Sequence, residues 1–199
     1  MKISIMTISL ALVGLLTIAN AQERIEVSKA KEYAQLTRQN PELLKTAPLY
    51  FEADLDQPVG LANNDFGGLV IPRADLAEGN EADVGREPVA IGEIWLYNLT
   101  LDKDGWPVSE NNLDIVTLNT NEGIAKFPRC ILGVKKTGAN SPVLMVFGKT
   151  QKPLLTVPLT KIHKNQSVPL DMSASEDGRV TLSISGKYQA SFKVAELYL

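Results

Sequence analysis

Short apolar runs separated by turn residues fill the chain from Leu49 to its end, and this pattern constrains the fold more than any other feature. The runs are rich in Val, Ile and Leu, and clusters of Asn, Asp and Gly lie between them, which is typical of strands joined by turns. Strands are expected at 49–51, 69–71, 94–101, 113–118, 124–134, 143–147 and 154–159. Many short strands with regular turn signals predict a mainly β, single-domain antiparallel β-sandwich, or else a barrel.

The C-terminal third carries enough alternation to predict its pairing register. Apolar residues alternate with polar or small ones over 168–174 and again over 180–184. A two-residue turn would set apolar residues against polar ones, whereas a three-residue loop over 176–178 places both apolar sets on one face. The predicted pairs are Ala174 with Val180, Met172 with Leu182 and Leu170 with Ile184.

Two glycines fit the loops that this register needs. Gly178 stands third in the first loop, where a type I turn followed by a bulge requires positive φ. A second three-residue loop over 185–187 keeps the apolar residues of 188–194 on the same face. One long strand running through Gly186 would preserve the same parity, so the pattern allows either arrangement there.

Residues 1–21 have the three parts of a cleavable secretory signal. Lys2 is followed by an apolar run over 3–18, and an Ala-Asn-Ala sequence over 19–21 places small residues before the cleavage point. Polar residues interrupt the apolar run, which is also short for a membrane-spanning helix. We therefore expect cleavage before Gln22, an exported protein that is periplasmic or secreted, and no transmembrane segment after cleavage.

Residues 23–39 have the composition of a helix, with Lys, Ala, Glu and Gln in close succession. One stripe at helical spacing is formed by Ala30, Tyr33, Ala34 and Thr37. Pro41 disfavours helical geometry in the residue before it, so the helix should end there. This segment is either a peripheral helix or a mobile lead-in. The expected organisation is a signal peptide over 1–21, a helical lead-in over 22–45 and a β domain over 46–199.

The net charge, the single cysteine and the single histidine limit the functions that the sequence can support. The net charge is −3 and there is no long basic run, so nucleic acid is not an expected partner. The only cysteine, Cys130, lies in an apolar segment and is expected to act as a small buried hydrophobe. The only histidine, His163, lies in a polar stretch with no recognisable triad partner, and a surface position is expected. The chain carries no phosphate-binding or zinc-binding motif.

Carboxylates are the remaining residues that suit catalysis or metal binding. Glu52, Asp54 and Asp56 alternate, so in a strand they would share one face. Such a group could bind calcium, which is the only cofactor that the sequence suggests. It could instead supply the acid and the base of a glycoside hydrolase. The alternative is a solvated edge strand whose charges discourage aggregation. The acidic loop over 72–90 has few apolar anchors and is expected to be mobile.

The two tryptophans have different expected environments. Trp95 belongs to the run 94–101, in which one face is formed by Trp95, Tyr97, Leu99 and Leu101 and is expected in the core. Trp106 follows an Asp-Gly turn and precedes a proline, so it is expected at an exposed loop tip. An exposed indole ring there suits stacking on a sugar.

These observations favour an exported, non-catalytic protein with a binding or assembly role at the cell envelope. The expected partner is an envelope protein or a glycan. Two alternatives stand beside this hypothesis. One is a calcium- or carboxylate-dependent hydrolase of extracellular polymer that uses the acidic residues, and the other is a carbohydrate-binding module that uses Trp106.

Overall fold

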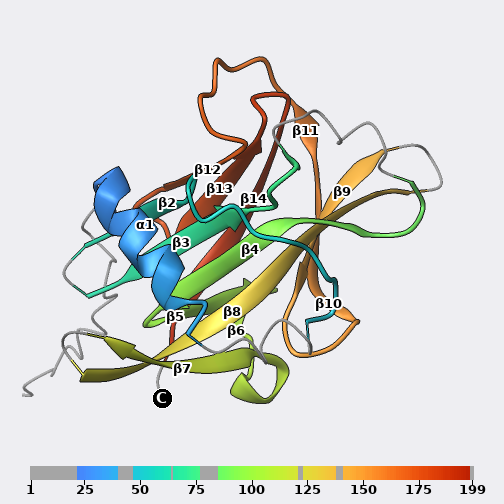
Figure 1. The fold of residues 1–199 in the computed structure, drawn as a ribbon. Helices are drawn as coiled ribbons and strands as arrows, with labels where there is room; N and C mark the ends of the chain where they lie inside the picture. The colour runs from blue at the N-terminus through green and yellow to red at the C-terminus, as the bar shows by residue number, and fades with distance from the viewer. Residues whose placement is uncertain are drawn as a thin grey trace, which may run out of the picture.

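The computed structural model describes residues 22–39, 47–63, 65–76, 85–120, 123–137 and 141–197. Within them, two antiparallel sheets pack face to face, and a helix lies on the outer face of the first sheet (Figure 1). The sheets are not closed into a barrel. The predicted mainly β sandwich with a short N-terminal helix is therefore confirmed.

The first sheet is built around the long strand β8 (Gly123–Lys136). One side of β8 pairs with β4 (Val89–Tyr97). Its other side pairs with β7 (Asp114–Thr120) along the first half and with β9 (Pro142–Phe147) along the second half. The remaining strands extend this sheet to its two edges: β3 (Gly67–Pro72), β2 (Val59–Ala62) and β1 (Glu23–Arg24) beyond β4, and β10 (Pro153–Pro158) beyond β9.

The second sheet is a C-terminal meander extended by a central hairpin. Its strands run in the order β12 (Leu170–Ala174), β13 (Arg179–Ile184), β14 (Tyr188–Glu196), β5 (Leu99–Lys103) and β6 (Trp106–Pro107). The short strand β11 (Thr160–Lys161) also pairs with β14, and a 3-10 turn (Glu110–Asn112) links β6 to β7.

The predicted register of the meander is confirmed. Ala174 pairs with Val180, and the two other predicted pairs follow in the same ladder. Gly178 has φ 75°, as its loop position requires. Ile184 pairs with Tyr188 across the second loop, so the chain forms a hairpin there rather than one long strand.

The main core lies between the two sheets, where alternate residues of both inner faces meet. Cys130 is fully buried in this core, as the sequence predicted. Its largest fully buried aliphatic members include Ile94, Leu96, Leu101, Leu132 and Leu144. Burial of these side chains supplies the main favourable term for a chain that has no disulfide.

Helix α1 (Val27–Leu36) packs on the outer face of the first sheet. Ala30 and Ala34 are buried against a cluster from three strands, formed by Leu69, Ile71, Trp95, Val116 and Leu118. Thr37, from the same predicted stripe, is also buried. Tyr33, the fourth member of that stripe, is 38% exposed. Its ring instead lies beneath the Lys29 ammonium, 5.7 Å from the ring centroid.

The strand expected at 49–51 is wrong. These residues adopt no strand geometry, and only Ala53 forms an isolated bridge, with Arg73. The segment instead covers the part of the first sheet's outer face that presents Ile131, Met145 and Phe147, and buries Phe51 there. An apolar sheet face needs a cover, and an extended segment without ladder pairing supplies one.

The single strand expected at 94–101 is also wrong. Asn98 has φ 53° and separates β4 from β5, and this kink carries the chain from the first sheet to the second. Trp95 consequently lies under helix α1, whereas Leu99 lies in the core between the sheets. Tyr97 is 40% exposed, so the expected common face does not exist.

The predicted signal peptide over 1–21 lies outside the described residues, and so does the middle of the acidic loop, over 77–84. Among the helices that the structure describes, none combines the length and apolar character needed to cross a bilayer.

Candidate functional site

The β5–β6 hairpin presents Trp106 to solvent. Its two-residue connection, Asp104-Gly105, has φ values of 57° and 86°, as in the type I′ turn that Asp-Gly favours. The Asp102 carboxylate accepts a hydrogen bond from the Gly105 N–H at 2.8 Å, and Lys103 pairs with Trp106 in the ladder. Trp106 is 76% exposed. A large aromatic side chain therefore projects from a tightly held turn.

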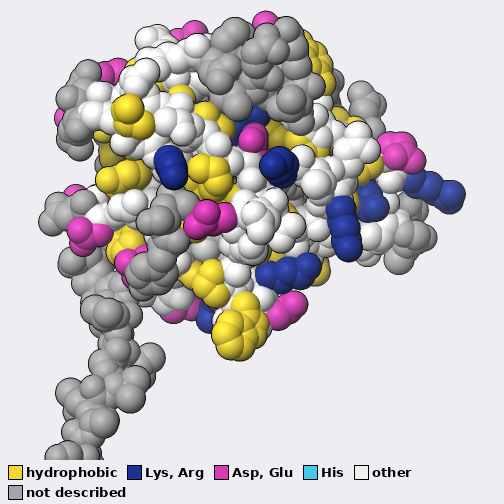
Figure 2. All heavy atoms as spheres, turned by 90° about the horizontal axis from the view of Figure 1, so that it is seen from below, with side chains coloured by type: hydrophobic (Ala, Val, Ile, Leu, Met, Phe, Trp, Pro, Cys, Tyr) yellow, Lys and Arg dark blue, Asp and Glu magenta, His cyan; other side chains and the backbone are white. Residues whose placement is uncertain are grey.

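The surface seen from below in Figure 2 carries its apolar side chains separately, with polar and charged side chains between them. Exposed large hydrophobic residues are few in the described part of the chain, and they come from different elements: Val27, Tyr33, Tyr50, Tyr97, Trp106 and Ile124. Single exposed apolar residues are ordinary. Trp106 has the largest ring among them, and an exposed indole combines a large contact area with little rotamer freedom.

The three predicted carboxylates do not share a strand face, because residues 51–56 form no regular strand. Asp54 accepts hydrogen bonds from the Asp56 N–H at 2.9 Å and from Gln57 Nε2 at 2.8 Å. Asp56 lies 3.3 Å from Lys31 Nζ, and Glu52 is exposed. Across the described residues, no group of three or more Asp, Glu, His or Cys side chains is arranged to hold a metal ion.

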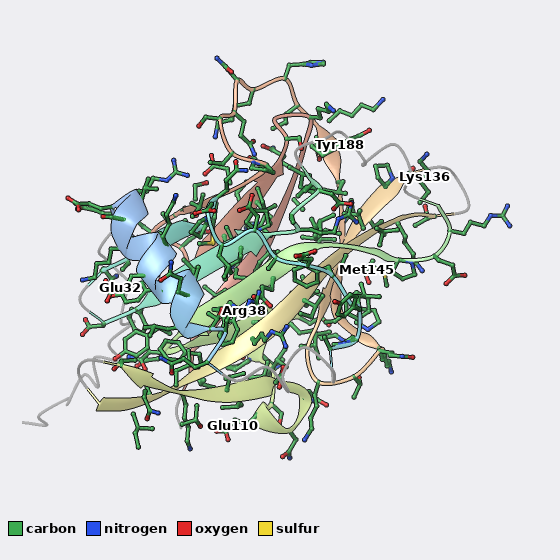
Figure 3. The ribbon with its side chains drawn as sticks, viewed as in Figure 1. Glu32, Arg38, Glu110, Lys136, Met145 and Tyr188 are labelled. Atoms are coloured by element: carbon green, nitrogen blue, oxygen red, sulfur yellow. The ribbon has the colours of Figure 1, made fainter. Side chains whose placement is uncertain are left out.

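A buried ionic network on the outer face of the first sheet has no counterpart in the sequence-based predictions. Glu93 of β4 is fully buried and contacts Arg129 Nε at 2.9 Å and Arg38 at 2.7 Å. Arg129 of β8, 1% exposed, also contacts the Asp114 carboxylate at 3.4 Å. Arg38 lies just past the C-terminal end of α1 (Figure 3). The network thus joins the helix to three strands, β4, β8 and β7.

Burial dominates the electrostatics at the edge of this network. It raises the pKa of the Asp114 carboxyl above the ordinary value, and the adjacent Arg129 guanidinium only partly opposes the shift. The Trp95 ring lies 5.7 Å from the Arg129 guanidinium carbon. Charged residues within apolar runs, Glu93 and Arg129, were the available sequence signal for this network.

The only cysteine, Cys130, and the only histidine, His163, lie in different environments. Burial raises the pKa of the Cys130 thiol to about 12, so little thiolate forms near neutral pH. His163 is exposed in the irregular segment before β12. Neither side chain is placed where the structure activates it.

A cavity of about 160 Å³ lies between the segment that enters α1, the start of β2 and the segment before β12, lined by residues including Arg24, Val27, Gly60 and Val168. Pockets for small ligands usually enclose roughly 300–1,000 Å³. The cationic group of Arg24 is already engaged by Asp171. This cavity is therefore a poorer candidate than the Trp106 hairpin.

No family model, curated protein or solved structure matches this chain.

Proposed function

We propose that this chain is an exported, non-catalytic binding protein that acts at the cell envelope and contacts its ligand through the β5–β6 hairpin. The observation that carries the proposal is Trp106, 76% exposed on a turn held by Asp102. Tryptophan dominates many binding surfaces because it buries a large area at a small cost in conformational entropy. A surface tryptophan on an ordered turn is pre-organised for that use.

A carbohydrate is the ligand class that this hairpin favours. The apolar face of a sugar ring packs on an indole, and the hydroxyl groups around it need polar partners. Asp102, Lys103 and Asp104 supply such groups on the same hairpin. A glycan needs only a small number of such contacts, which suits a surface whose apolar residues lie apart.

The hydrolase alternative has weaker support. Its candidate residues Glu52, Asp54 and Asp56 form no common face, and the Asp54 oxygens are engaged within their own turn. An acid and base for glycoside hydrolysis must flank one bond at a fixed separation. The 160 Å³ cavity has one carboxylate, Asp56, among its described lining residues.

The test uses the two tryptophans as internal reporters. Trp95 is 3% exposed and Trp106 is 76% exposed, so acrylamide quenching of the native protein reports mainly on Trp106. Binding of cell-wall or plant oligosaccharides from an array should protect the wild type from quenching. Trp106→Ala should abolish array binding, while Tyr50→Ala, which removes another exposed ring, should leave it unchanged.

Export is tested separately by the intact mass of protein recovered outside the cytoplasm, which should begin at Gln22. Retention of Met1 on that material would contradict export by cleavage. Array binding that survives in Trp106→Ala, or that is absent from the wild type, would contradict the glycan-binding role of the hairpin without bearing on export.

A further inference from the structure

Strand β7 is an edge strand in the described part of the chain. Among the described strands it pairs only with β8, and it lies at the lower border of the fold (Figure 1). Its sequence, Asp-Ile-Val-Thr-Leu-Asn-Thr, has no proline and no lysine. Unpaired N–H and C=O groups along such an edge are a template for another strand.

The other outer strands are protected in recognisable ways. β10 has a proline at each end, and β1 and β6 contain two residues each. In β12, Asp171 engages Arg24 and Lys164, whose charged side chains lie beside that edge. Proline, short length and edge charge are the usual means of blocking edge-to-edge pairing, and β7 has none of them over 115–119.

We propose that two copies of this chain associate by antiparallel pairing of β7 with β7, about a two-fold axis at Thr117. This interface goes beyond the proposed function and does not depend on it. An isologous contact requires a surface that complements itself. The sequence of β7 does so in this register: Val116 meets Leu118 of the second copy, and Thr117 meets Thr117 of the second copy.

Side-chain chemistry supports this register on both faces of the new ladder. Thr opposite Thr is a favourable cross-strand pair, and Val opposite Leu keeps two apolar side chains together on the other face. Val116 and Leu118 are already buried beneath α1, whereas Thr117 is exposed. A slip by one residue would place Leu118 opposite Thr117 and would lose this match.

An exposed apolar residue lies one strand away from the proposed interface. Ile124 is 76% exposed and pairs with Asn119 across the β7–β8 hairpin. Residue 115 of the second copy would lie opposite Asn119, on the face that carries Ile124. Strands in a sheet are about 4.8 Å apart, so these two isoleucines would lie on one face of the extended sheet with Asn119 between them. One pair of strands makes a small interface, so we expect a weak dimer.

The test is the oligomeric state of the purified chain, measured by sedimentation and light scattering over a concentration series. Thr117→Glu should fold normally, because Thr117 is exposed and the new carboxylate lies opposite Lys126 within the same hairpin. It should nevertheless shift the dimer to monomer, because two like charges meet at the axis. Thr156→Glu, the same change at an exposed position of β10, should remain dimeric.

A charge swap tests the register. Thr117→Lys alone should be monomeric, and an equimolar mixture with Thr117→Glu should recover a dimer that contains one copy of each variant. A wild type that stays monomeric up to about 100 micromolar would overturn the proposal. It would equally be overturned if Thr117→Glu remained dimeric, or if the mixture stayed monomeric while both variants showed native circular dichroism.

Discussion

The outer face of the first sheet and the meander of the second sheet hold their strands in place by interactions of different range. In the first, Glu93 connects Arg129 on the neighbouring strand with Arg38 beyond the end of α1. In the second, β12, β13 and β14 follow one another along the chain and are joined by three-residue loops. The first arrangement depends on residues far apart in sequence, and the second depends on turn chemistry.

The two regions also treat charge differently. Glu93 and Asp171 each contact two cationic side chains. The partner Arg129 is 1% exposed at its side chain, whereas the partners of Asp171, Arg24 and Lys164, are 54% and 53% exposed. A buried cation that loses its partner cannot recover hydration, but an exposed cation can. Removing Glu93 should therefore destabilise the protein more than removing Asp171, although each contacts two cationic side chains.

Glu93→Ala should produce the largest effect. It removes the closer of the two carboxylates that the buried Arg129 contacts and leaves Asp114 at 3.4 Å, so we expect a loss of up to about 3–5 kcal/mol in the free energy of unfolding, measured by urea denaturation. The matched control is Asp171→Ala, which should cost about 1 kcal/mol or less because its partners are exposed.

The double variant Glu93→Leu with Arg129→Met should recover much of that loss, because it removes both fully buried charges together, whereas Arg38 and Asp114, which lose these contacts, are 21% and 25% exposed. Equal denaturation midpoints for Glu93→Ala and Asp171→Ala would remove the proposed distinction between the two regions.

Gly178→Val should have an intermediate effect, confined to the meander. Gly178 has φ 75°, which a β-branched residue adopts only with strain, and we expect a loss of roughly 1–3 kcal/mol. Gly178→Asn should cost less, because asparagine tolerates the left-handed region. Thermal unfolding of the three proteins checks this order. If Val and Asn at this position both matched the wild type, the loop geometry and its register would be wrong.

Cys130→Ala should have the smallest effect on the free energy of unfolding near neutral pH. The contribution of the Cys130 thiol to that free energy should change at alkaline pH. Burial raises the pKa of the folded thiol to about 12 from an ordinary value of 9.0, so the unfolded state releases its proton first. The stabilising contribution is present below pH 9 and is lost as the pH rises toward 12.

A thiol reagent should accordingly label Cys130 only after the protein unfolds. The Cys130→Ala variant should lose less stability than the wild type when the pH is raised into the alkaline range. The matching measurement is urea unfolding at neutral pH and at about pH 11. Fast labelling of the native protein would place Cys130 outside the core.

The candidate site was predictable only in part. The Asp-Gly sequence before Trp106 indicated a turn and an exposed ring, and both follow from local backbone preferences. The carboxylates at 52–56 were expected to share a face because 49–51 looked like a strand. That expectation was wrong because the segment covers an apolar face of the sheet instead of joining a ladder. Periodicity cannot separate these two uses of a short apolar run.

By itself, the sequence determined the sandwich class, most strands and the register of the C-terminal meander, because parity and turn residues act between neighbours in the chain. Only the tertiary structure decided that the chain changes sheets at Asn98, that α1 covers the first sheet and that Glu93 meets both Arg38 and Arg129. These features depend on which surfaces meet in space. A buried charge or a kinked strand becomes favourable only when its distant partner is in place.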